Sequence, residues 1–168
     1  MIPPRQHVLR TRLNFITLHA YVELSFLWVK NLVGFMSLPV LHEMIRTCQL
    51  CPLGKTRILA VPGEGPARPR VMLIGEAPGR NEDESGRPFF GAAGKRLDAL
   101  LENAGLNRND VFITSVVKCR PPNNRVPTLE EATTCKTHYL EKQILLLQPV
   151  LIGLMGRTAI QHVLGEPI

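Results

Sequence analysis

The sequence has few aromatic residues and lacks the motifs that mark common nucleotide sites. Aromatic side chains make up only 5% of its 168 residues. No G-x-G-x-x-G occurs, so a Rossmann-type dinucleotide site has no support. The GAAGK at 91–95 does not complete a Walker loop either, because Phe89 stands where that loop needs its first glycine and Arg96 replaces its serine or threonine. A phosphate-cradling loop is therefore disfavoured.

The sequence also lacks an uninterrupted apolar run long enough to cross a membrane. A span needs about 18 or more such residues. The most apolar stretch, residues 13–40, is broken by polar residues: Asn14, His19, Glu23, Lys30 and Asn31. The N-terminal arginines are not followed by a small-residue cleavage site of the kind that ends a secretory signal. We therefore expect a cytoplasmic protein with no membrane partner.

Length and composition predict one globular domain preceded by an atypical segment. A content of 45% hydrophobic and 20% charged residues is that of an ordinary globular domain. Residues 1–35 look unlike the remainder, and we interpret them as an N-terminal extension or the product of a mis-called start. The domain is assigned to residues 36–168. The net charge of +6 suits a nucleic-acid partner, but part of it lies in residues 1–35.

The chemistry is expected where an apolar run enters a loop rich in glycine, proline and carboxylates. Val71–Ile74 suits a strand buried on both faces, which Gly75 ends. In an open α/β sheet, ligands bind beyond the carboxyl ends of such strands. The segment 75–94 shows no obvious element, and loops of that length are usually functional or disordered. The alternative is a solvated connection with two core phenylalanines, Phe89 and Phe90.

Helices and strands alternate along the rest of the chain. Helices are predicted over 38–47, over 97–104 with Gly105 as the C-terminal stop, over 128–147 behind a capping box formed by Thr128 and Glu131, and over 157–164. Further strands are predicted over 111–117 and 150–155. Strands separated by helices imply parallel pairing. The predicted fold class is therefore α/β, a three-layer α/β/α sandwich around a short parallel sheet, with its last strand missing.

Four cysteines form a candidate metal site: Cys48, Cys51, Cys119 and Cys135. Without a secretory signal, such residues are more often metal ligands than disulfides. Four thiolates suit structural zinc or an iron–sulfur cluster, and spacing alone does not separate the two. Either of the last two cysteines, taken alone, could be a small buried hydrophobe.

Several segments together resemble the family-4 uracil-DNA glycosylases. They are Cys48-x2-Cys51, VPGEG at 61–65, IGEAPG at 74–79, the acidic pair Glu82-Asp83, GRPFFGAAGK at 86–95 and VVKCRPPNNR at 116–125. The likeness runs from about Met36 to Gly165. It implies a uracil-DNA glycosylase-like fold, a 4Fe-4S cluster on the four cysteines, and excision of the uracil that cytosine deamination leaves in DNA.

The resemblance also implies roles for single residues. Glu76, Ala77 and Pro78 line the uracil site, and Glu82 supports the pocket as the second catalytic candidate. Because cleavage builds positive charge on the sugar, we predict Glu76 as the catalytic carboxylate beside it, the alternative being a hydrogen bond to its own turn. Phe89 stacks on the base, whereas Phe90, on the opposite side by strand-like alternation, is expected to matter for folding. The predicted uracil-binding set is Gly75, Glu76, Ala77, Pro78, Phe89 and Ser115. From their charge we predict that Lys118, Arg120 and Arg125 contact DNA phosphates, the alternative being solvated surface cations.

Two departures from the family pattern affect the predicted activity. Ser115 stands where the family has the asparagine that reads the uracil edge. The family continues into a last strand with a His-Pro motif, which this sequence does not contain, so we expect weak catalysis. The predicted function is hydrolysis of the N-glycosidic bond of uracil in DNA, leaving an abasic site, by a monomer acting on uracil-containing DNA. The alternative is a non-catalytic, metal-stapled nucleic-acid-binding module.

Overall fold

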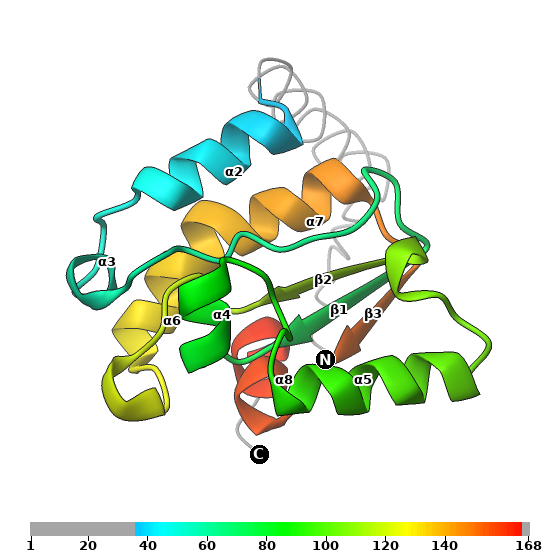
Figure 1. The fold of residues 1–168 in the computed structure, drawn as a ribbon. Helices are drawn as coiled ribbons and strands as arrows, with labels where there is room; N and C mark the ends of the chain where they lie inside the picture. The colour runs from blue at the N-terminus through cyan, green and yellow to red at the C-terminus, as the bar shows by residue number, and fades with distance from the viewer. Residues whose placement is uncertain (1–35, 166–168) are drawn as a thin grey trace, which may run out of the picture. The chain divides into compact units, whose positions relative to one another are not determined.

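A parallel sheet with helices on both faces forms the centre of the fold (Figure 1). The computed structural model describes residues 36–165, so the segment predicted as an extension lies outside the described residues. Strand β1 (Val71–Gly75) lies between β2 (Val111–Ser115) and β3 (Leu151–Leu154), and both pairings are parallel. The predicted α/β class is confirmed.

The helices largely follow the predicted boundaries. They are α2 (Leu38–Thr47), α3 (Leu53–Thr56), α4 (Arg80–Ser85), α5 (Ala92–Asn103), α6 (Leu129–Cys135), α7 (Glu141–Leu147) and α8 (Arg157–Leu164), with short 3-10 turns η1 (Arg108–Asp110) and η2 (Pro122–Asn124) and a π-helical turn η3 (Lys136–Leu140) between α6 and α7. The predicted capping box at the start of α6 is confirmed, since Thr128 Oγ1 accepts from the Glu131 amide at 3.2 Å.

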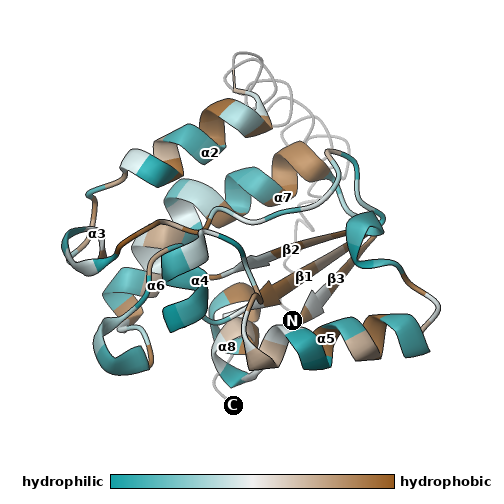
Figure 2. Ribbon diagram, viewed as in Figure 1, coloured by the Kyte–Doolittle hydropathy of each residue, from teal (hydrophilic) through white to brown (hydrophobic). Residues whose placement is uncertain are grey.

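The sheet buries side chains on both faces. Leu97 and Leu101 of α5 pack with Val111 and Ile113 on one face. On the other face the strands contribute buried residues such as Met72 and Phe112, and the helices α2 and α7 contribute Leu41, Ile45 and Leu147. Figure 2 shows the strands as the apolar centre, with polar stretches on the surrounding helices.

Two positions predicted on the apolar face of α5 are exposed. The i, i+3, i+4, i+7 spacing predicts one apolar face of Leu97, Leu100, Leu101 and Ala104, yet Leu100 is 65% exposed and Ala104 is exposed too. Three residues beyond Leu97, a side chain falls about 60° away around the helix axis. Of the four, Leu97 and Leu101 are buried against Val111 and Ile113 of the sheet.

The segment 75–94 contains a helix that the sequence did not reveal. Helix α4 begins after Gly79, whose amide donates to the Glu82 carboxylate at 3.1 Å, and it ends at Gly86 with φ +72°. Half of a capping box is thus present. Because the N-cap residue is a glycine, it has no side chain that could accept from the Glu82 amide, and the sequence therefore lacks the usual capping-box pattern.

The connections after β1 and β2 leave the sheet toward opposite faces. The chain after β1 runs through α4 and α5, whereas the chain after β2 runs through α6 and α7 on the other side (Figure 1). Such a divergence opens a crevice outside the carboxyl ends of the two strands, the usual ligand position in open α/β sheets. The fold therefore places residues 75–78 and Ser115 at one edge.

Candidate active site and metal centre

A pocket of about 220 Å³ opens at the carboxyl ends of β1 and β2. Its walls are Val61, Ala77, Pro78, Gly79, Glu82, Pro88, Phe89, Ala93 and Ser115. Four of the predicted uracil-binding residues are thereby brought together. Ser115 closes the pocket from the last position of β2, with 5% of its surface exposed.

The ring of Phe89 lies directly on Gly75. A methyl group at position 75 would come within 2.8 Å of that ring, so only glycine permits the contact. Phe89 itself has φ +50°, in the left-handed region that costs a non-glycine residue about 1–3 kcal/mol. Gly94 at the start of α5 lies so close to the Phe89 carbonyl that a Cβ there would overlap it. Two glycines thus hold one aromatic ring in a strained position.

Glu76 follows Gly75 and lies at the same edge of the sheet, outside the pocket wall. Its carboxylate accepts a hydrogen bond from the hydroxyl of Thr158, a buried residue in the first turn of α8. Thr158 was not predicted as a site residue from the sequence. Its position after the third strand, like that of Glu76 after the first, is the signal that pointed to it. Glu76 is therefore held in one orientation beside the pocket.

The four cysteines line one cavity between the end of α2, the loop after β2 and the end of α6. Cys119 and Cys135 are buried, Cys48 and Cys51 are half-buried, and all four are free thiols. Among residues 36–165, no group of three or more His, Cys, Asp or Glu has the arrangement of a single-ion site. The four cysteines thus form one candidate metal centre, and four thiolates suit structural zinc or an iron–sulfur cluster.

Two sulfur atoms of this cavity accept hydrogen bonds. Arg57 Nη1 donates to Cys119 Sγ at 3.0 Å, and the Leu50 amide donates to Cys48 Sγ at 3.4 Å. Burial raises the pKa of Cys119, an effect that the Arg57 guanidinium opposes. Burial also raises the pKa of Cys135, to about 12. The environment therefore favours thiols unless a metal supplies the compensating charge.

Comparison with known proteins shows the family of this chain. A family model described as the uracil DNA glycosylase superfamily matches residues 62–167. The chain is 52% identical over 134 residues to the type-4 uracil-DNA glycosylase of Pyrobaculum aerophilum, across 78% of this chain and 68% of that relative. This chain belongs to the uracil DNA glycosylase superfamily.

Within the superfamily, the type-4 proteins resemble this chain more than the type-5 proteins do. The type-4 uracil-DNA glycosylase of Saccharolobus solfataricus is 49% identical across 75% of this chain and 58% of its own length. The type-5 protein of Thermus thermophilus is 32% identical, across 74% of this chain and 70% of its own length. The chain thus spans between 58% and 68% of the length of the two type-4 relatives. The predicted family is confirmed.

Glu82 holds the pocket loop of this superfamily member together. Its carboxylate accepts from the amides of Gly79, Phe90 and Gly91 at 3.1, 3.0 and 3.2 Å. Both ends of the loop that carries Phe89 are thus tied to one carboxylate. These contacts make Glu82 a positioning residue in this structure, whereas a direct catalytic role stays a prediction.

Arg108 is a second support, and the sequence offered no signal for it. Its Nη2 donates to the Pro88 carbonyl and to Glu64, both at 2.7 Å, while Nη1 contacts Asp98 at 2.7 Å. The guanidinium thus fixes the residue immediately before Phe89 from a turn twenty residues away. Only the tertiary fold brings Arg108 to this loop.

The prediction that Lys118 contacts DNA phosphates is wrong. The side chain is buried, and Nζ donates to Thr114 Oγ1 at 2.6 Å and to the Ser115 carbonyl at 2.7 Å. Burial lowers the pKa of Lys118 to about 7. Because Lys118 lines the cysteine cavity and its Nζ bonds to the Ser115 carbonyl, it supports Ser115 and does not face solvent.

Phe90 does not have the core role that alternation suggested. It is 52% exposed, and the Arg87 guanidinium lies 5.5 Å from its ring centroid. Alternation holds only for extended backbone, and the left-handed conformation of Phe89 breaks it. The pair therefore divides differently, with Phe89 at the pocket and Phe90 at the surface.

Arg120 and Arg125 lie in the loop between the last two cysteines. Arg120 Nε donates to Asn124 Oδ1 at 2.7 Å. Arg125 makes two bonds of 2.8 Å to Glu131, which neutralise its charge and hold the loop against α6. Arg120 is therefore the less neutralised cation of the two, and phosphate contact by either stays a prediction.

Of the helices described here, none is long and apolar enough to cross a bilayer.

Proposed function

We propose that this chain hydrolyses the N-glycosidic bond of uracil in DNA and leaves an abasic site. The observation that carries the proposal is the Phe89 ring held on Gly75 at the mouth of the crevice between β1 and β2. Membership of the superfamily, and the type-4 relatives named above, support the same activity.

The pocket suits a base that has left the helix stack. Extruding a nucleotide costs a few kcal/mol, which stacking and hydrogen bonds in the pocket must offset. An aromatic face contributes roughly 1–3 kcal/mol per stacked base. A strained but locked Phe89 provides this face without losing side-chain freedom on binding, and Ser115 offers one hydroxyl to the polar edge of the base.

The chemistry assigned to the site is heterolysis of the bond between uracil N1 and C1′ of the sugar. The bonding electrons leave with the uracil, positive charge develops on the sugar, and a water molecule then adds to C1′ and loses a proton. A carboxylate beside the sugar stabilises that positive charge. Glu76 has this role, because it lies beside the pocket and not within it, held by Thr158.

Uracil release from single-stranded DNA tests the proposal. The wild-type chain should release uracil, and Glu76→Gln should slow release roughly 10²-fold, the usual scale for one electrostatic contact to a transition state. Glu84→Gln is the matched control, since Glu84 pairs with Arg80 on the surface of α4. Tight binding of uracil-containing DNA without any release would instead favour the non-catalytic module.

We further infer that Cys48, Cys51, Cys119 and Cys135 hold a 4Fe-4S cluster. Bound there, the cluster would cross-link the end of α2, the loop after β2 and the end of α6. Protein purified without oxygen should be brown, and Cys135→Ser should remove the visible absorption. Colourless protein with one zinc ion per chain would support the structural-zinc alternative.

The partner that we propose is uracil-containing DNA, bound by the chain as a monomer. Arg120 directly follows Cys119, which lines the cysteine cavity, and its Nε donates to a neutral amide, so its charge is available to a phosphate. Substituting a phosphate-contacting residue should make the plot of log binding constant against log salt concentration shallower, by about one unit of slope. Arg120→Ala is expected to have that effect, and Arg125→Ala a smaller one, because Glu131 already pairs with Arg125.

A further inference from the structure

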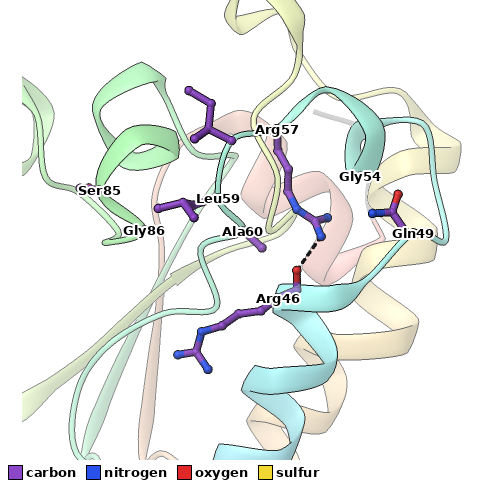
Figure 3. Close-up of a pocket in the computed structure, with 9 residues that line it drawn as sticks. Arg46, Gln49, Gly54, Arg57, Leu59, Ala60, Ser85 and Gly86 are labelled. Carbon is purple, nitrogen blue, oxygen red and sulfur yellow. Dashed lines mark hydrogen bonds between the residues drawn. The ribbon is translucent and has the colours of Figure 1, made fainter.

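Arg57 lies between two cavities of different character. One is an open, polar cavity lined by Arg46, Gln49, Gly54, Arg57, Ile58, Leu59, Ala60, Ser85 and Gly86, shown in Figure 3. The other is the enclosed cavity of the four cysteines, which also has Arg57 in its wall. The Arg57 side chain therefore separates the cysteine sulfur atoms from an opening to solvent.

Both terminal nitrogens of this guanidinium have defined partners. Nη1 donates to Cys119 Sγ at 3.0 Å, and Nη2 donates to the Arg46 carbonyl at 2.7 Å, the contact drawn as a dashed line in Figure 3. The Arg46 carbonyl belongs to the last turn of α2, where helix carbonyls have no intrahelical donor. One planar group thus joins the end of α2, which leads into Cys48, to the sulfur of Cys119.

We propose that Arg57 is a positioning residue for the cysteine cluster. It orients the Cys119 sulfur, offsets the negative charge of that ligand and closes the cluster off from the open cavity. This inference rests on the cluster proposed above, but not on uracil excision.

The electrostatic consequence follows from the charges around the sulfur atoms. Hydrogen bonds and positive charge beside ligand sulfurs stabilise the reduced, more negative form of a cluster and raise its reduction potential. Lys118 is the other basic side chain in the cavity wall, but its Nζ donates to Thr114 and to the Ser115 carbonyl. In the part of the chain that the structure describes, Arg57 is thus the cationic side chain hydrogen-bonded to a cysteine sulfur.

Three variants, compared with the wild-type protein without oxygen, test the inference. Arg57→Gln removes the charge and the paired bonds, Arg57→Lys keeps the charge, and Arg46→Gln removes a charge from the same open cavity while leaving its backbone carbonyl in place. The first measurement is the rate of iron release to a chelator. The second is the midpoint potential of the cluster at an electrode, which supplies the electron.

Arg57→Gln should release iron about tenfold faster, the lower end of the loss usual for outer-shell partners of metal ligands. Its midpoint potential should become more negative. Arg57→Lys should release iron faster but keep a potential near that of the wild type, and Arg46→Gln should change neither value.

An unchanged potential and release rate in Arg57→Gln would overturn the inference. Equal shifts in Arg57→Gln and Arg46→Gln would overturn it too, because the effect would then come from net charge in the cavity and not from the sulfur contact. A wild-type chain that binds no iron would overturn it together with the cluster, whatever its uracil release.

Discussion

In the proposed function, Phe89 is the residue on which base recognition depends most directly. Its ring lies against Gly75, and its left-handed backbone lies so close to Gly94 that a side chain there would overlap it. A stacking face matters only for a base that has been extruded. The role of this residue is therefore separable from general affinity for DNA.

Phe89→Ala should weaken binding of DNA carrying an uncleavable uracil nucleotide by roughly 1–3 kcal/mol, the value of one base stack. Binding of undamaged DNA should change little. Fluorescence anisotropy with the two DNAs measures the difference, and Phe90→Ala serves as the control because Phe90 lies at the surface. Equal losses for both DNAs would assign Phe89 to general packing.

In the proposed function, Ser115 is the residue most relevant to base selectivity. A hydroxyl donates one hydrogen, whereas the amide of asparagine offers both a donor and an acceptor to the uracil edge. Ser115→Asn should therefore increase uracil binding or release, measured as the single-turnover rate on uracil-containing DNA. A slower rate with unchanged thermal stability would show that position 115 does not read the base.

At the scale of the elements, charged side chains from other segments hold the loop that carries Phe89 in the pocket wall. Helix α4 and the start of α5 are joined through Glu82, and the turn η1 reaches the same loop through Arg108. Glu64 connects Arg108 to the segment that pairs with β2, since it bridges to Ile113. The loop is thus ordered by residues from three separate parts of the chain.

Removing Arg108 should loosen this loop. Arg108→Met should lower the free energy of unfolding by about 2 kcal/mol, because hydrogen bonds from a charged donor are worth roughly that much. Uracil release should also slow. Chemical denaturation and single-turnover assays measure the two effects.

Arg87→Met is the matched control for Arg108→Met, because Arg87 also contacts Glu64 but its side chain is 56% exposed. Exposed ion pairs contribute little to stability. If both variants lost the same stability, the Pro88 contact of Arg108 would not be the source of the effect.

At the scale of the whole molecule, buried polar groups make stability depend on pH. Burial, together with the charges of Arg46 and Lys118, lowers the pKa of His42 on α2 to about 4, from 6.5 in an unfolded chain. Between these values the unfolded state binds a proton that the folded state does not. Stability is therefore lost as the pH falls from about 6.5 toward 4.

His42→Gln should reduce this pH dependence. Urea unfolding midpoints at pH 7.5 and pH 5 should differ more for the wild type than for the variant, and His138→Gln, at an exposed position, should behave as the wild type does. Below about pH 4.5 a further loss is expected, because the Arg125 hydrogen bonds lower the pKa of Glu131. A variant with undiminished pH dependence would exclude His42 as the source.

The sequence by itself determined the features whose causes are local. Apolar runs and caps located β1, α2, α6 and α8, because these patterns act within one or two turns of the chain. The strand exit at Gly75 identified the pocket edge, and the motif set identified the family.

Only the tertiary structure decided which residues meet across long separations. Arg108 reaches Pro88, Thr158 reaches Glu76 and Arg57 reaches Cys119 through pairings that no local pattern encodes. Burial, too, depends on what lies opposite, which is why Lys118 is enclosed while Leu100 and Phe90 are exposed. Local preference is a property of a segment, whereas contact and burial are set by packing that involves the whole sheet and its helices.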